Sequence, residues 1–87
     1  MKLKNLMEGA VFQAIDEAKG NYEFCDCEKC RVDIAALALN QLPPRYVVTE
    51  KGDSYARTDF LALQKNLDVF STVIKAIKKV KESPSHD

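Results

Sequence analysis

The stretch that decides the fold is residues 25–48, which read CDCEKCRVDIAALALNQLPPRYVV. It opens with three cysteines, continues into a run of apolar helix formers and ends at two prolines followed by Arg-Tyr-Val-Val. Because residues 34–39 offer no polar position, a helix over about residues 28–40 should be buried on several sides. Pro43 and Pro44 cannot continue this helix, since proline lacks the amide donor and clashes with the preceding turn.

Amphipathic helices are expected on both sides of this stretch. The first should end at Gly20-Asn21. Its stripe at i, i+3, i+4 and i+7 consists of Leu3, Leu6, Met7, Ala10, Val11, Ala14, Ile15 and Ala18. The last helix should begin near Ser54 or Thr58 and run to about Lys81, with residues 83–87 as a frayed tail. A heptad seam, which suits two interlocking helices, is formed there by Phe60, Leu63, Leu67, Phe70, Ile74 and Ile77, widened by Val73 and Val80.

Residues 45–49 are β-prone, but the only partner we identify is a weak one at residues 54–56. We therefore predict an all-α fold, a single small helical domain of three to four helices spanning residues 1–87, with one long C-terminal helix. A chain of 87 residues has a thin core, yet 46% of its residues are hydrophobic. We expect a homodimer whose interface is the heptad seam and the apolar helix 28–40.

The charge balance disfavours several classes of function. With 13 basic and 13 acidic residues the net charge is zero, so no excess is available to neutralise nucleic-acid phosphates or anionic lipids. The longest apolar run, residues 34–39, is too short to span a bilayer. Glu8, Asp16 and Glu17 interrupt what would be the apolar part of a secretory signal. We expect a cytoplasmic protein with reduced thiols and no membrane insertion.

Cys25, Cys27 and Cys30 form a C-x-C-x-x-C cluster at the entrance to the helix 28–40. This spacing lets thiolates converge on one ion, while the helix start supplies amide donors, so the cluster favours zinc or an iron–sulfur centre. Zinc is preferred because iron–sulfur clusters usually take four cysteines. The fourth ligand stays open: it is a water, a residue of another segment, or one of Asp26, Glu28, Asp33 and the sole histidine, His86.

Other interpretations of the cysteines are weaker. A structural disulfide needs an oxidising compartment and leaves one thiol over, and a redox Cys-x-x-Cys site usually follows a strand. Three inert buried thiols are not expected in a polar loop. An open zinc position would permit Lewis-acid hydrolysis, but we identify no general base or nucleophile beside it. We therefore interpret the metal as structural and the protein as not an enzyme.

Two further groups are candidates for ligand contacts. Arg45, Tyr46 and Arg57 combine guanidinium groups with an aromatic ring, which suits gripping a phosphate and stacking a base, although such residues also close interfaces. The last helix has a basic end, which is a solvated face or a phosphate contact. Its members are Lys75, Lys78, Lys79 and Lys81.

Residues 25–31, 33–40 and 42–47, with Leu6-Met7-Glu8 and Gly52, resemble the late competence protein ComFB family. The resemblance implies a helical fold, a symmetric homodimer and zinc at the cysteines. In some bacteria members are encoded with competence genes, and in others they are described as cyclic dinucleotide receptors. We predict a zinc-binding regulatory or adaptor protein that acts as a homodimer through a protein partner. The alternative is a cyclic dinucleotide receptor using Arg45, Tyr46 and Arg57 at a dimer cleft.

Overall fold

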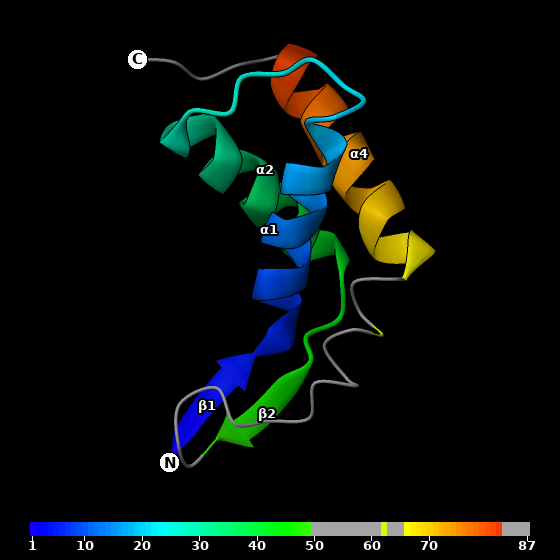
Figure 1. Cartoon of the computed structure of the whole chain (residues 1–87). Helices are drawn as coiled ribbons and strands as arrows, with labels where there is room; N and C mark the ends of the chain where they lie inside the picture. Colours follow the sequence, from blue (N-terminus) through cyan, green and yellow to red (C-terminus); the bar gives the residue numbers. More distant parts are fainter. Residues whose placement is uncertain (50–61, 63–65, 83–87) are drawn as a thin grey trace.

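The computed structural model describes residues 1–49, 62 and 66–82 of the chain (Figure 1). Within these residues three helices form a bundle, and a two-stranded ribbon projects from one end of it. In chain order the elements are β1 (Lys2–Asn5), α1 (Leu6–Ala18), α2 (Glu28–Gln41), β2 (Tyr46–Thr49) and α4 (Leu67–Glu82). None of the helices in the described part of the chain is long and apolar enough to cross a membrane.

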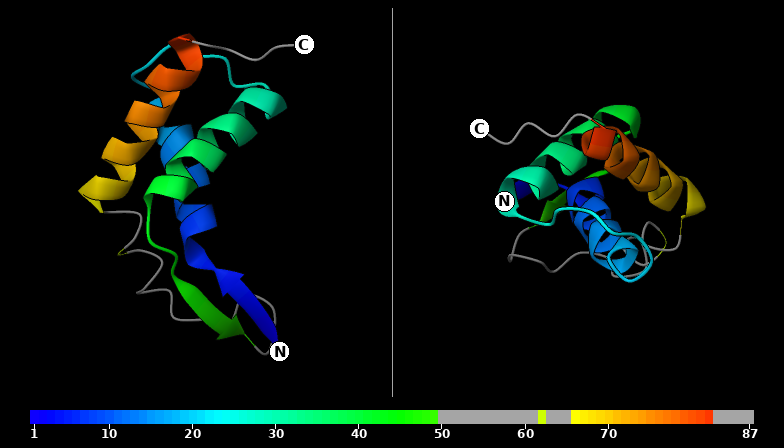
Figure 2. Two further views of the ribbon diagram at one scale, coloured as in Figure 1. Left: turned by 180° about the vertical axis from the view of Figure 1, so that it is seen from behind. Right: turned by 90° about the horizontal axis from the view of Figure 1, so that it is seen from above.

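The three helices enclose one apolar core, because each of them packs against the other two (Figure 2). The centre of this core consists of large side chains that are almost completely removed from solvent, which is the main favourable contribution to folding. These side chains are Leu6, Val11, Ile15, Ile34, Val69, Val73 and Ile77.

Helix α1 follows the predicted stripe from Leu6 onward, and every stripe residue from Leu6 to Ala18 is buried. Asn5 caps its start, since the side-chain Oδ1 accepts a hydrogen bond from the Met7 amide at 3.1 Å. At the other end the amides of Asn21 and Tyr22 donate to the Ala18 carbonyl, which closes the last turn. The helix therefore begins and ends on residues whose local chemistry favours those positions.

The expectation of an all-α fold is wrong at the N-terminus. Leu3 belongs to strand β1 instead of α1, and it lies opposite Val48 in an antiparallel pairing of β1 with β2. Four residues cannot distinguish a helical stripe from a strand alternation, and the partner lies more than forty positions away in sequence. The strand 45–49 thus has a partner that the sequence pattern did not identify.

Helix α2 is buried on one side only, contrary to the prediction that it would be covered on several sides. Its buried residues are Cys30, Ile34, Ala35 and Ala38, whereas Val32 and Ala36 are exposed. Small side chains on the outer face make a helix look uniformly apolar without requiring a neighbour. The helix ends at Gln41, before the two prolines, as expected.

Helix α4 faces the core with a stripe that shares Ile77 with the predicted seam, and Val73 and Val80 with its margin, but is centred differently. Its buried residues are Val69, Val73, Ala76, Ile77 and Val80. Phe70 and Ile74 are only partly buried, and Leu67 is 82% exposed. Val73 and Val80, which were predicted at the margin of the seam, belong to the buried face. A wide apolar stripe fits both a 3.5 and a 3.6 residue period, so the sequence alone does not fix its centre. The predicted helix start, Phe60, Leu63 and the tail 83–87 lie outside the described residues.

Candidate metal centre

The loop between α1 and α2 brings the three cysteines together. Their Sγ atoms all lie within 4.8 Å of one another. Cys25 and Cys27 are exposed, whereas the Cys30 side chain is 2% exposed and belongs to the core. All three are free thiols. The cluster therefore extends from two exposed sulfurs in the loop to a third sulfur buried in the core.

The distances match the needs of a metal ion. Two sulfurs that bind one zinc ion at about 2.3 Å are roughly 3.8 Å apart at the tetrahedral angle. A cluster whose largest separation is 4.8 Å therefore has to contract by no more than about 1 Å. No carboxylate or imidazole of the described residues belongs to the same cluster, so three sulfurs are the ligand set that this part of the chain offers. The cysteines could hold a metal ion.

The start of helix α2 determines where the sulfurs lie. Cys27 is the N-cap residue with extended backbone (φ −63°, ψ 161°), and its carbonyl accepts the first helical hydrogen bond from the Arg31 amide at 2.9 Å. Cys30 follows in the first turn, whereas Cys25 lies on the extended side. Exposed amides and the positive end of the helix dipole favour negative charge at this position, which suits thiolate ligands.

The three thiols differ in acidity. The pKa of Cys27 is lowered, first because the backbone amide of Cys30 stabilises its thiolate and next because of the Cys25 side chain. Burial raises the pKa of Cys30 to about 12, with smaller contributions from Cys25 and Cys27. At neutral pH Cys30 therefore keeps its proton in the metal-free chain and has to release it in order to bind an ion.

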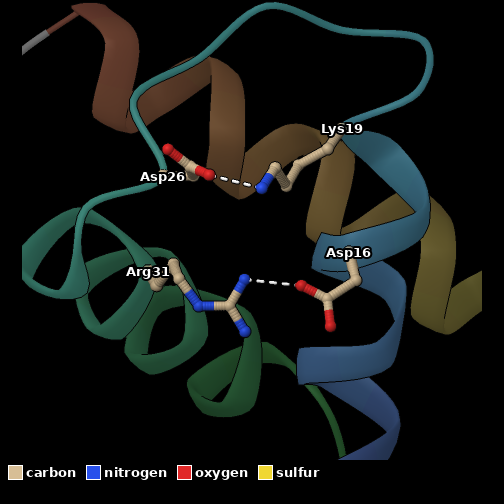
Figure 3. A network of polar contacts seen from close by, with 4 residues as sticks. All are labelled: Asp16, Lys19, Asp26 and Arg31. Carbon is tan, nitrogen blue, oxygen red and sulfur yellow. Dashed lines mark hydrogen bonds and ion pairs between the residues drawn. The ribbon is translucent and has the colours of Figure 1, made fainter.

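Two ion pairs hold the cysteine segment against α1 (Figure 3). Lys19 pairs with Asp26, which lies between the first two cysteines, and this contact lowers the pKa of the Asp26 carboxyl group. Arg31 Nη1 donates to Asp16 Oδ1 at 2.6 Å. The Arg31 guanidinium also lies 5.6 Å from the centre of the Phe12 ring, which is cation–π distance. These contacts were not predicted from sequence, because nothing in the residue pattern indicates which charges meet across a loop.

The proposed alternatives for a fourth ligand have other contacts or lie apart. Asp26 is engaged by Lys19, and Asp33 lies 3.6 Å from Lys29 on the same helix. His86 is outside the described residues. Asp26 or Asp33 would have to leave its present ion pair to serve as the fourth ligand. Glu28, the other candidate near the cysteines, does not belong to the cluster either.

The predicted ligand-contact residues Arg45 and Tyr46 do not lie beside the cysteine cluster. Tyr46 is the first residue of β2 and Arg45 precedes it, and both are exposed. The Arg45 amide donates to Asn5 Oδ1 at 2.9 Å, and its carbonyl accepts from the Leu6 amide at 2.8 Å. This position is at the opposite end of α1 from the cysteine loop (Figure 1). Arg57 lies outside the described residues.

The fold and the site define a class: a small helical domain with a β-ribbon, whose helix–helix loop carries a C-x-C-x-x-C cluster. The family model described as late competence development protein ComFB matches residues 4–84. The chain belongs to the ComFB family. The resemblance inferred from residues 25–47 is thereby confirmed.

Two relatives support this assignment. Competence protein ComFB of Bacillus subtilis (strain 168) is 34% identical over 61 residues, which cover 70% of this chain and 62% of that protein. The match thus spans less than two thirds of the relative's length. A solved structure, described as a structural characterization of the late competence protein ComFB from Bacillus subtilis, superposes with a TM-score of 0.79 at 29% identity. It covers 97% of this chain and 96% of that chain.

Proposed function

We propose that this chain is a non-enzymatic, zinc-binding adaptor of the cytoplasm that acts as a homodimer through a protein partner. The observation that carries the proposal is the convergence of three sulfurs within 4.8 Å at the start of α2. Thiolates select zinc among the common divalent ions, and a reducing compartment keeps them available. Three cysteines suit zinc better than an iron–sulfur cluster, which usually takes four.

In this proposal the zinc has a structural role. An ion held by Cys25, Cys27 and Cys30 would fix the loop to the first turn of α2, whose buried Cys30 is part of the core. Ion binding would then determine how the loop leaves α1. A small domain gains much of its stability from such a staple.

The homodimer is supported by the exposed apolar surface of the ribbon. Leu3 and Val48 lie opposite each other in the β1–β2 pairing and are 72% and 61% exposed, and Tyr46 lies two positions from Val48 on the same face at 59%. An isolated two-stranded ribbon is marginally stable in water, so a second copy covering this face would stabilise it. We propose this ribbon face as the interface in place of the heptad seam, since Phe70 and Ile74 pack against the chain's own core.

Light scattering of the purified chain at micromolar concentration tests the dimer. The proposal expects a particle of twice the 9.8 kDa chain mass, and Leu3→Ser with Val48→Ser should reduce it to the mass of one chain. The control is Leu67→Ser, which removes a still more exposed leucine from α4. A 9.8 kDa particle for the unmodified chain would rule out the homodimer.

A second candidate function is binding of a cyclic dinucleotide. It is supported by the adjacent guanidinium and aromatic side chains of Arg45 and Tyr46, both exposed at the start of β2. Isothermal titration with cyclic dinucleotides should give saturable heat that Arg45→Ala removes. Absence of heat with all of them leaves the adaptor as the proposed function.

A further inference from the structure

A groove of about 430 Å³ runs between α2 and α4, which lie side by side (Figure 2). It uses the later part of α2, well after Cys30 in the first turn. Its lining residues are Leu37, Gln41, Thr72, Lys75, Ala76 and Lys79.

The groove combines an apolar floor with a basic rim. Ala76 is buried and Leu37 is partly buried, whereas Lys75 and Lys79 are exposed and lie one helical turn apart. Gln41 adds an amide at the edge. An apolar floor of Leu37 and Ala76 flanked by two cations one turn apart suits an amphipathic helical segment that presents one apolar side chain between two carboxylates.

Stabilisation of the C-terminus of α4 does not by itself explain both lysines of the rim. Cations near a helix C-terminus interact favourably with the helix dipole, but this effect is confined to the last turn. Lys79 belongs to the last turn of α4, and Lys75 does not. Neither lysine forms an ion pair with the described residues, whereas Lys19 and Lys29 do. Their charge is therefore directed at solvent beside an apolar floor.

We infer that this groove binds an acidic amphipathic segment of a partner protein. Two carboxylates one helical turn apart on that segment would reach Lys75 and Lys79, while an apolar side chain between them rests on Leu37 and Ala76. The inference rests on the proposed adaptor function and names the chemistry of its partner. A floor of apolar side chains distinguishes this surface from a site for a free phosphate, which needs only donors and charge.

Fluorescence anisotropy with a labelled amphipathic peptide tests the inference. The probe has glutamates at i and i+4 beside a leucine, and a control peptide carries lysines in place of the glutamates. Lys75→Glu with Lys79→Glu replaces two attractions by two repulsions, so it should weaken peptide binding about tenfold. Lys78→Glu with Lys81→Glu makes the same change of net charge on α4 outside the groove. It should change the affinity less than about twofold.

The floor is tested by Leu37→Gln, which keeps the charges and should weaken binding at high salt as well as at low salt. Equal weakening by the two lysine pairs, absence of saturable binding, or displacement of the peptide by inorganic triphosphate would each overturn the inference. Thermal melts of all variants verify that they are folded.

The same titration, done with zinc-loaded and chelated protein, separates the two proposals. A chain that holds zinc but does not bind the peptide overturns the groove alone. A chain that binds the peptide but never holds zinc overturns the proposed metal centre alone.

Discussion

The two ends of helix α1 are held in different ways. At its C-terminal end, the cysteine cluster joins the loop to α2 through residues that lie within six positions of one another. At its N-terminal end, β1 pairs with β2 across more than forty positions. The Asn5 side chain links the start of α1 to the residue before β2, because it accepts hydrogen bonds from the Met7 and Arg45 amides. The first end depends on local chemistry, whereas the second depends on the fold already being formed. The two ends should therefore respond to different perturbations.

The largest expected effect is the removal of the proposed zinc ion from the cysteine end. Zinc present at about 1,000 times its Kd stabilises the folded chain by about 4 kcal/mol. Chelation should therefore lower the Tm by about 15–30 °C in a domain of this size. Hydrogen exchange measured on the chelated protein should increase first in residues 21–30, with the β1–β2 amides retaining their protection. Earlier loss of protection in the ribbon would contradict a locally acting metal.

The next effect concerns the ribbon end, and the chain offers a matched control. Asn5 and Asn66 are both N-terminal caps, since Asn66 Oδ1 accepts from the Asp68 amide at 2.8 Å. Asn5 Oδ1 accepts in addition from the amide of Arg45, the residue before β2. Asn66→Ala should cost about 1 kcal/mol as a lost cap. Asn5→Ala should cost about 2 kcal/mol, because the Arg45 amide loses its partner as well.

Urea denaturation of the two variants measures this difference. Asn5→Asp keeps the acceptor oxygen and should restore most of the stability lost in Asn5→Ala. Equal losses for Asn5→Ala and Asn66→Ala would show that the bond across the ribbon contributes nothing.

The smallest effect is expected for the ion pairs that hold the cysteine loop on α1. Both pairs are partly exposed, so solvent screens them, and the Arg31–Asp16 pair contributes about 0.2–1 kcal/mol. A double-mutant cycle of Asp16→Asn and Arg31→Gln, each of which removes one charge of the pair, should give a coupling energy in this range that decreases at high salt. A coupling energy unaffected by salt would indicate that packing of Arg31 on Phe12, rather than charge, holds the loop.

The same contrast explains what the sequence could and could not predict. Some features could be predicted because they depend on residues close together in sequence. They are helix α1 from Leu6 onward, the end of α2 before Pro43 and the clustering of the cysteines. Other features depend on which segments meet in space. They are the strand around Leu3, the single buried face of α2 and the pairing of Lys19 with Asp26. A periodicity shows that a face is apolar, but not whether another element covers it.

Native mass spectrometry of the purified chain tests the metal centre most directly. We expect one zinc ion per chain and loss of that ion in Cys27→Ser, whose sulfur is exposed and therefore replaceable without disturbing the core. A chain purified without any bound metal, or a Cys27→Ser variant that retains its zinc at full occupancy, would contradict the proposed metal centre.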